Sequence, residues 1–292
     1  MAAATIDIDA RLLRDWPLPV PGSAADKEDR GSTLVVAGGG ETPGAALLAA
    51  HAALRAGAGK LAVATGASVA RGLAFALAEA RVIALPESDA GGLAADGLAK
   101  IEARLAKVDA VLVGPGLQDA AATRAFVRRL LKRTTRAAIV LDALAMDVVI
   151  DIRRFERPPL LTPHAGEMAH LTGFAREEIL ADPERHAREA ALRWNAVVAL
   201  KGPTTMLATP DGDCWRHTSQ QPGLGTSGSG DVLAGIVVGL AARGAPLAQA
   251  AAWAIALHAH AGAALAVRRG PVGYLASELA AEVPALMAQL AH

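Results

Sequence analysis

Short runs of apolar residues recur along this chain, separated by longer stretches with helical periodicity, and this alternation constrains its fold more than any other feature. The apolar residues in each run are consecutive, which is typical of strands in a parallel sheet covered on both faces. The runs that predict strands are residues 34–37, 61–64, 82–85, 110–113, 138–141 and 196–200. Strands that alternate with helices favour an α/β fold: a doubly wound, mostly parallel sheet with helices on both faces.

The clearest helix is predicted over residues 43–56, because proline stands at its first position and Gly57 just past its end. At 292 residues the chain is long enough for one large α/β domain with a substantial core. No shift in composition divides it. We therefore expect a lead-in segment of residues 1–30 and a single domain of residues 31–292.

Charge and cysteine content exclude several kinds of partner and site. Lysine plus arginine equals aspartate plus glutamate at 29 each, so no net field attracts nucleic acid or an acidic membrane. Cys214 is the only cysteine, which excludes an intramolecular disulfide and a metal site built from several cysteines. Residues 1–10 lack the basic and apolar regions of a signal peptide, so we expect a cytoplasmic protein.

One apolar stretch, residues 248–267, contains no Lys, Arg, Asp or Glu and is long enough to span a bilayer. It is mostly alanine, however, and it holds Gln249, His258 and His260. We therefore predict a buried core helix at this position and no membrane partner.

The densest cluster of glycines opens a predicted helix. Residues 223–231 read Gly-Leu-Gly-Thr-Ser-Gly-Ser-Gly-Asp, and the apolar positions after them keep a helical period up to Gly244. Glycines let a backbone approach a ligand closely, and the free amides at a helix N-terminus bind anions. Asp231 is explained equally well in two ways. It either complements the helix dipole or acts as a general base toward a hydroxyl that attacks a phosphoryl group.

Two familiar nucleotide-binding motifs fit the chain poorly. Gly223, Gly225 and Gly228 have the spacing G-x-G-x-x-G, but the chain continues through two long helical segments without a clear strand. A Walker loop around Lys60 lacks the serine or threonine that should follow the lysine, since Leu61 stands there. We therefore expect neither site.

Other candidate loops follow predicted strands, where ligands bind in open α/β sheets. Gly-Pro-Gly at residues 114–116 is also a common turn, and the histidine and carboxylate within residues 160–167 also suit a hydrogen-bonded core. The lysine of residues 201–205 either contacts a phosphate or is solvated. The remaining histidines have no metal-ligand spacing and are assigned no chemistry: His51, His170, His186, His217, His258, His260 and His292.

Taken in order, these loops resemble the ADP-dependent NAD(P)H-hydrate dehydratase family of the ribokinase-like superfamily. The resemblance covers residues 31–292 and implies a ribokinase-like fold. The matching segments are Pro43-Gly44-Ala45-Ala46, Arg55-Ala56-Gly57-Ala58-Gly59, Gly114-Pro115-Gly116-Leu117, Leu141-Asp142-Ala143, Thr162-Pro163-His164, Gly166-Glu167, Lys201-Gly202 and Gly228-Ser229-Gly230-Asp231.

The resemblance implies dehydration of the S epimer of hydrated NADH or NADPH, with ADP or ATP as co-substrate and Mg²⁺ as cofactor. Phosphorylating the ring hydroxyl makes phosphate the leaving group, and the ring nitrogen can expel it. The implied catalytic groups are the base Asp231 and an anion hole of the Gly228, Ser229 and Gly230 amides. The implied binding residues are Ala45, Gly116, His164 and Asp231 for the substrate, Lys201, Gly202, Pro203, Thr204, Thr205 and Gly230 for the nucleotide, and Glu167 for Mg²⁺ through water.

The resemblance also implies a homo-oligomer, either a dimer or a tetramer, and a separate epimerase that interconverts the hydrate epimers. Two other functions share the motifs: a ribokinase-like kinase for a hydroxymethyl heterocycle or a sugar, and a nucleotide-binding regulator without turnover. Leu144 is the clearest departure, because the family usually has an aspartate there. The period of two along a strand would place residue 144 on the same face as Asp142, so we expect Leu144 to weaken cation handling.

Overall fold

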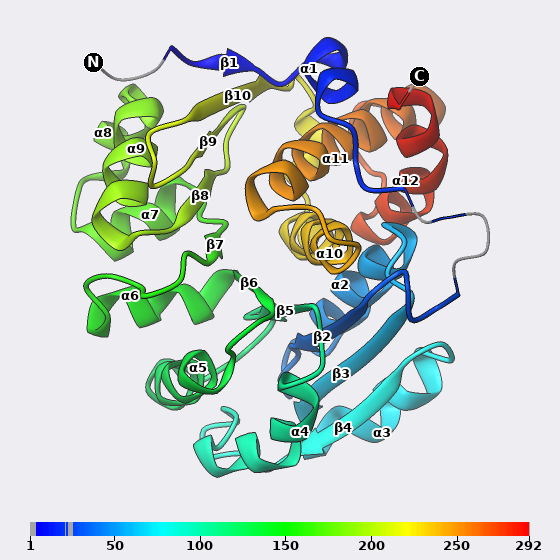
Figure 1. Ribbon diagram of the computed structural model, residues 1–292, viewed down its shortest axis with the longest axis vertical. Helices are drawn as coiled ribbons and strands as arrows, with labels where there is room; N and C mark the ends of the chain where they lie inside the picture. The colour runs from blue at the N-terminus through cyan, green and yellow to red at the C-terminus, as the bar shows by residue number, and fades with distance from the viewer. Residues whose placement is uncertain (1–3, 21, 23–25, 292) are drawn as a thin grey trace.

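The computed structural model describes residues 4–20, 22 and 26–291. Within them, one ten-stranded sheet has the order β1-β10-β9-β8-β7-β6-β5-β2-β3-β4 (Figure 1). The strands are β1 (Ile6–Asp7), β2 (Ser32–Val36), β3 (Lys60–Gly66), β4 (Arg81–Leu85), β5 (Ala110–Val113), β6 (Ala138–Leu141), β7 (Leu160–Leu161), β8 (Val197–Leu200), β9 (Thr204–Ala208) and β10 (Cys214–Thr218).

Helices connect most of these strands, and short 3-10 helices (η) supplement them. The α-helices are α1 (Ala10–Asp15), α2 (Gly44–Arg55), α3 (Ala67–Ala76), α4 (Glu102–Leu105), α5 (Ala120–Arg133), α6 (Val148–Asp151), α7 (Ala165–Thr172), α8 (Arg176–Ala181), α9 (Pro183–Trp194), α10 (Ser229–Ala242), α11 (Leu247–Arg269) and α12 (Ala276–Leu290). The 3-10 helices are η1 (Ala95–Lys100), η2 (Ala143–Asp147) and η3 (Pro222–Leu224).

The sheet is mostly parallel, as predicted. Strands β2 to β8 pair in parallel, β8–β9 and β9–β10 pair antiparallel, and β1 adds in parallel to β10. Every apolar run that predicted a strand overlaps one of β2, β3, β4, β5, β6 or β8, with Ala37 just after β2 and Ala196 just before β8. Strands β1, β7, β9 and β10 were not predicted, because two of them have only two residues and the other two form a hairpin with partly exposed side chains.

Helices cover both faces of the sheet, and each face has its own apolar core. One core lies under α2, α10, α11 and α12 and contains Val35 and Leu112. The other lies under α5, α7 and α9 and contains Leu34 and Val111. Successive strand residues thus enter opposite cores, because side chains alternate along a strand. This arrangement explains why the strands are apolar throughout.

Helices α2 and α10 pack with their backbones in close approach. Gly235 and Gly239 lie one turn apart on α10, and a Cβ atom on either would stand 2.4 Å from a carbonyl oxygen of α2, that of Ala49 or Ala53. Because only glycine leaves room for these carbonyls, the spacing of α2 and α10 depends on the two glycines.

Helix α11 contains the stretch that we considered as a membrane span. Among the residues that the structure describes, it is the one helix long and apolar enough to cross a bilayer, yet 67% of its most apolar window is buried inside the fold. Its Trp253 is 1% exposed within the core under α10 and α12. The prediction of a buried core helix is confirmed.

The N-terminal segment joins the sheet and the core, and is more than the surface lead-in that we expected. Strand β1 pairs with β10, and Trp16 stacks on Trp215 with 5.4 Å between the ring centroids. The carbonyl oxygen of Trp16 accepts hydrogen bonds from Gln249 Nε2 at 3.1 Å and Trp253 Nε1 at 2.8 Å. We propose one domain that includes the described part of residues 1–30.

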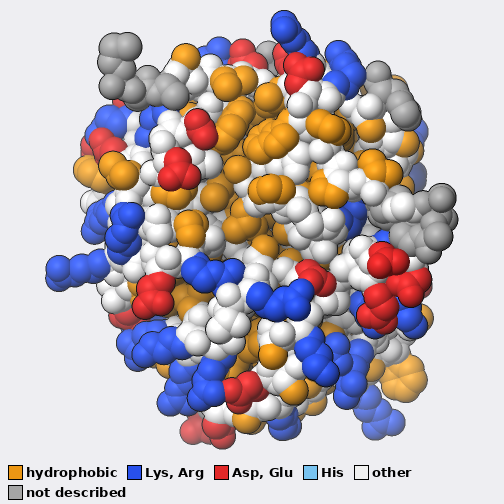
Figure 2. All heavy atoms as spheres, viewed as in Figure 1, with side chains coloured by type: hydrophobic (Ala, Val, Ile, Leu, Met, Phe, Trp, Pro, Cys, Tyr) orange, Lys and Arg blue, Asp and Glu red, His pale blue; other side chains and the backbone are white. Residues whose placement is uncertain are grey.

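On the face drawn in Figure 2, acidic and basic side chains lie intermixed, and apolar side chains gather in the upper centre. The mixture of signs matches the balanced composition of 29 basic and 29 acidic residues. Any recognition of phosphate groups should therefore depend on local contacts, and the carboxyl ends of the parallel strands are the expected place for them.

Candidate functional site

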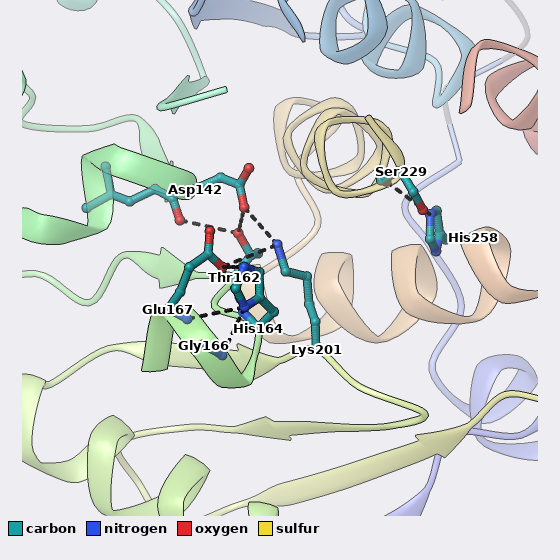
Figure 3. Close-up of polar contacts among 9 residues, drawn as sticks. Asp142, Thr162, His164, Gly166, Glu167, Lys201, Ser229 and His258 are labelled. Carbon is teal, nitrogen blue, oxygen red and sulfur yellow. Dashed lines mark hydrogen bonds and ion pairs between the residues drawn. The ribbon is translucent and has the colours of Figure 1, made fainter. Parts of the chain in front are cut away.

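The residues that follow β6, β7 and β8 meet at one edge of the sheet, because these strands are parallel neighbours (Figure 3). They are Asp142, Thr162 and Lys201. Asp142 Oδ1 accepts a hydrogen bond from Thr162 Oγ1 at 2.5 Å and from Lys201 Nζ at 3.2 Å. The Lys201 amide donates to the Pro163 carbonyl at 2.7 Å, which ties the ends of β7 and β8 together.

The ammonium group of Lys201 lies among carboxylates, and this arrangement shifts two pKa values. Burial lowers the pKa of Lys201, but the attraction of Asp142 and Glu167 outweighs it, so the net pKa is raised. Burial raises the pKa of Asp231 to about 6, helped by the charges of Asp142 and Glu167. Lys201 therefore stays positive at neutral pH, while Asp231 is poised to take up a proton there.

The predicted glycine-rich turn opens α10, as expected. Gly228 caps the helix with φ 87°, in the left-handed region, and Asp231 lies in the first turn. The first amides of a helix lack intrahelical acceptors, but that of Ser229 donates to the Thr226 carbonyl at 3.3 Å. The amides of Gly228 and Gly230 are therefore the stronger candidates for binding an anion.

His164 caps helix α7, and its hydrogen bonds determine which ring nitrogen carries the proton. Nδ1 accepts from the amides of Gly166 at 3.0 Å and Glu167 at 3.2 Å, and Glu167 Oε2 accepts from the His164 amide at 2.8 Å. With Nδ1 as the acceptor, the neutral imidazole has its proton on Nε2. The His164 side chain is 59% exposed, and its Nε2 lies 3.6 Å from Glu167 Oε2, so a ligand would reach this Nε2–H beside the carboxylate.

Two other substrate residues implied by the resemblance, Ala45 and Gly116, lie together. A Cβ atom on Gly116, whose φ is 66°, would stand 2.7 Å from the Cβ of Ala45 in the first turn of α2. Thr42 Oγ1 donates to the Gly116 carbonyl at 3.0 Å. A Cβ atom on Gly228 would meet Leu48 Cδ1 at 2.4 Å. The start of α2 therefore lies against the glycine-rich turn.

The implied nucleotide residues form the turn from β8 into β9. Within it, the Gly202 amide donates to Thr205 Oγ1 at 3.4 Å and Thr204 Oγ1 lies 3.1 Å from Thr218 Oγ1. A Cβ atom on Gly230 would lie 3.2 Å from Lys201 Nζ. The structure thus brings Lys201, at the start of this turn, beside the N-terminus of α10. Pro203, in the middle of the turn, is exposed to solvent.

A cavity of about 340 Å³ lies beside the site, and its lining residues include Leu144, Asp147, His164, Glu167 and His170. Strand β6 ends at Leu141, and η2 follows with Ala143 at φ 46°. The argument that a strand period of two places residues 142 and 144 on one face is therefore wrong. Leu144 nevertheless lines the cavity together with Glu167, while Asp142 is 2% exposed and bonded to Lys201.

His258 is a neighbour of the site that the sequence analysis missed. Its Nε2 lies 2.8 Å from Ser229 Oγ and 3.1 Å from the Ser229 carbonyl oxygen (Figure 3). The available signal was a polar residue inside an apolar helix, which indicates a buried partner without identifying it. His170 pairs with Asp147 at 3.2 Å, and His292 lies outside the described residues.

The carboxylates of the site fit Mg²⁺ only as a partly hydrated ion. Within residues 4–20, 22 and 26–291, no group of three or more His, Cys, Asp or Glu side chains is arranged to hold a metal. Mg²⁺ does not need one, because it keeps several waters and binds through one or two carboxylates and substrate phosphates. Glu167, which borders the cavity and lies 3.9 Å from Lys201 Nζ, suits a contact through water.

Fold and site together define the class of protein. It is a ribokinase-like α/β protein in which a glycine-rich turn and a first-turn aspartate lie beside a lysine at the end of a parallel strand. Within that class, the chain belongs to the NAD(P)H-hydrate dehydratase family, whose family model matches residues 33–285. The resemblance seen in the sequence is confirmed.

Individual relatives agree with this assignment. The chain is 45% identical over 283 residues to the ADP-dependent (S)-NAD(P)H-hydrate dehydratase of Xanthomonas campestris pv. campestris, covering 97% of this chain and 96% of that protein. It is 39% identical to the bifunctional NAD(P)H-hydrate repair enzyme of Moorella thermoacetica, covering 98% of this chain but 56% of that longer protein. The ADP/ATP-dependent NAD(P)H-hydrate dehydratase of Bacillus subtilis, co-crystallized with ATP/Mg²⁺, matches with a TM-score of 0.85 and 28% identity, covering 99% of this chain and 100% of that one.

Proposed function

We propose that this protein dehydrates the S epimer of hydrated NADH or NADPH, using ADP or ATP as the phosphoryl donor. The observation that carries the proposal is Asp231. It is a carboxyl group with a pKa of about 6, in the first turn after Gly228-Ser229-Gly230 and near the Lys201 ammonium. A base, backbone anion donors and a cation together are what phosphorylation of a hydroxyl requires.

In the proposed reaction, the Asp231 carboxylate takes the proton of the ring hydroxyl as its oxygen attacks the terminal phosphorus. The bond to the leaving nucleotide breaks, and the nucleotide departs one phosphate shorter. The ring nitrogen lone pair then expels the new phosphate, and loss of a proton from the adjacent ring carbon restores the double bond. The amides of Gly228 and Gly230, with a lesser contribution from that of Ser229, hold the charge of the transferred group.

The remaining residues position the two ligands in this proposal. Ala45, Gly116 and the His164 Nε2–H contact the hydrate, and Lys201 with residues 202–205 and Gly230 contact the nucleotide. Glu167 would hold Mg²⁺ through water, and the ion would supply neutralisation of the phosphate charge. The family relationship, the cavity beside His164 and the closeness of Lys201 to α10 support these roles.

Incubating the protein with nucleotide, Mg²⁺ and the S hydrate of NADH tests the proposal. We expect the dihydronicotinamide absorbance to return with one phosphate released per molecule of hydrate. A stable phosphorylated product without that absorbance would indicate a kinase for a hydroxymethyl compound or a sugar. Nucleotide binding without consumption in a single turnover would indicate a regulator.

We also propose a functional partner, an assembly and a location. A separate epimerase would supply the S epimer from the other epimer. The bifunctional Moorella thermoacetica relative, of which this chain spans 56%, supports a functional link to a second activity. A homo-oligomer, dimer or tetramer, is supported by the exposed apolar side chains of Val267, Val272 and Leu275, and light scattering on the purified protein measures it. The buried free thiol of Cys214 supports a cytoplasmic location.

The pH dependence of the reaction should follow the ionisation of Asp231. Because its pKa is raised to about 6 by burial and the carboxylate is the active form, kcat/KM should rise with pH through about 6 and level off above it. The measurement is kcat/KM for the hydrate between pH 5 and 8 at saturating nucleotide. A profile that stays flat over this range would remove Asp231 as the titrating base.

Leu144→Asp should lower the Mg²⁺ concentration needed for half-maximal rate. The change adds a hard carboxylate ligand to the cavity wall that Glu167 also lines, and carboxylate oxygens are what Mg²⁺ prefers. Leu144→Asn, similar in size but uncharged, is the matched control and should shift the midpoint less. The idea fails if the Mg²⁺ titrations of all three proteins coincide, or if Leu144→Asp loses activity at every Mg²⁺ concentration.

A further inference from the structure

A partly buried contact between α10 and α11 lies at the end of the glycine-rich turn. His258, in the middle of α11, places Nε2 2.8 Å from Ser229 Oγ and 3.1 Å from the Ser229 carbonyl oxygen, at the first residue of α10 (Figure 3). Helix α11 is held firmly at this level. Beyond His258, a Cβ atom on Gly262 would meet Leu224 at 2.7 Å, next to the same turn. The contact therefore joins two packed elements.

The chemistry of the two acceptors determines the proton arrangement. Burial lowers the pKa of His258 to about 4, so the ring is neutral at neutral pH. A carbonyl oxygen can only accept, so the 3.1 Å contact to the Ser229 carbonyl places the proton on Nε2. The same N–H points at Ser229 Oγ, which then accepts as well. The hydroxyl proton of Ser229 is left to donate in another direction.

The end of the turn needs such an anchor because the residues on either side of Ser229, Gly228 and Gly230, have no side chain that could provide one. Gly228 caps α10 without a side-chain hydrogen bond, and Gly230 follows Ser229. Glycines allow close approach to a ligand but carry the largest backbone freedom, which must be lost to hold a fixed geometry. Ser229 is 5% exposed and is the one residue of Gly228-Ser229-Gly230 with a side chain.

We infer that His258 is a positioning residue for phosphoryl transfer. By holding both the carbonyl and the hydroxyl of Ser229, it fixes the directions of the flanking Gly228 and Gly230 amides and frees the Ser229 hydroxyl to donate toward the transferred phosphoryl group. This inference rests on the proposed function. Misplacing preorganised donors weakens transition-state binding more than ground-state binding, so the effect belongs in kcat.

The test compares single-turnover rates at saturating enzyme and nucleotide, a readout that the fraction of folded protein does not change. His258→Leu, which removes the N–H, should lower the rate about 10-fold or more, with nucleotide affinity changed less than 3-fold. His258→Gln restores one N–H donor and should recover most of the rate. His260→Gln is the matched control: it lies two residues away on α11, with its ring 6.5 Å from that of His217, and should match the parent protein.

Equal rates in His258→Leu and His260→Gln would overturn the inference, as would a His258→Gln rate as low as that of His258→Leu. Nitrogen-15 spectra of the parent protein provide a second test, which needs no variant to fold. They should show His258 neutral with the proton on Nε2, and a proton on Nδ1 instead would overturn the inference. If the parent protein itself gives no dehydration, the proposed function fails, and the spectra still decide whether His258 holds Ser229.

Discussion

Asp231→Asn should lower the rate of hydrate dehydration by about 10²–10⁴-fold, the usual cost of losing a general base. The amide keeps the size of the side chain but cannot take up the hydroxyl proton. Nucleotide affinity should stay within a few-fold of the parent value, because the Gly228 and Gly230 amides and Lys201 remain. Steady-state rates combined with nucleotide calorimetry separate the two effects.

The same substitution should stabilise the fold at neutral pH. The pKa of Asp231 is raised from 3.8 to about 6 in the native state, so the native state binds the proton more tightly than the unfolded chain between these values. Stability therefore falls as pH rises across this window, and the ionised group costs stability above it. Asp231→Asn removes that cost, which should raise the free energy of unfolding at pH 7 by roughly 1–2 kcal/mol.

Asp211→Asn, at the exposed end of the β9–β10 hairpin, is the control for both effects and should change neither. If Asp231→Asn turns over at more than a tenth of the parent rate, Asp231 is not the base, and the helix-dipole explanation of this residue takes its place. If the variant is inactive but less stable than the parent, burial does not raise the pKa of Asp231 in the native state.

Gly239→Ala should destabilise the protein by about 2–3 kcal/mol, even though alanine favours helices over glycine by about 1 kcal/mol. The reason is steric, because the new methyl group would stand 2.4 Å from the Ala53 carbonyl oxygen across the α2–α10 contact. The atom that the new methyl group would meet belongs to the backbone of α2, so no flexible side chain can move aside to relieve the overpacking. For a protein of this size the loss corresponds to a melting temperature lower by about 3–5 °C.

Gly72→Ala provides a control of opposite sign. Gly72 lies on the exposed side of α3, and a Cβ atom there meets nothing within 4 Å. This variant should be more stable than the parent by about 0.5–1 kcal/mol, from helix propensity alone. Thermal or urea unfolding of both variants decides the matter, and a Gly239→Ala protein as stable as Gly72→Ala would show that α2 and α10 can separate without cost.

Much of the fold could be predicted because its central strands are buried on both faces. A strand such as β5 sends Val111 into one core and Leu112 into the other, so its apolar run is continuous and easy to recognise. The same rule misses β10, where Arg216 and Thr218 are exposed, and β7, which has two residues. Strand β1 could not be predicted from its own residues, because Ile6 and Asp7 form a strand only by pairing with β10, which is far away in the sequence.

The parts of the site whose backbone conformation requires glycine could be predicted from the sequence. The parts that depend on contacts between residues distant in the sequence could not. Glycines before Asp231 indicated an anion-binding turn from sequence alone, and that turn does open α10. The partner of His258 could not be predicted, because a lone histidine has no spacing pattern and Ser229 is 29 residues away. The argument about Leu144 failed because β6 gives way to η2 immediately after Leu141.

The position of β1 also has a consequence for how the chain folds during synthesis. Its residues emerge from the ribosome before the other strands of this sheet, yet they pair with β10, and the Trp16 carbonyl accepts a hydrogen bond from Trp253, 237 residues later. At about 5–20 residues per second, the N-terminal segment waits roughly 12–50 s before its contacts on α11 exist. Trp16 gains its stacking partner Trp215 only when β10 has been made, and its hydrogen-bond partner Trp253 later still, whereas β2 and β3 can already pair. Nascent chains of this protein therefore expose their N-terminal segment to chaperones and proteases until α11 has been made.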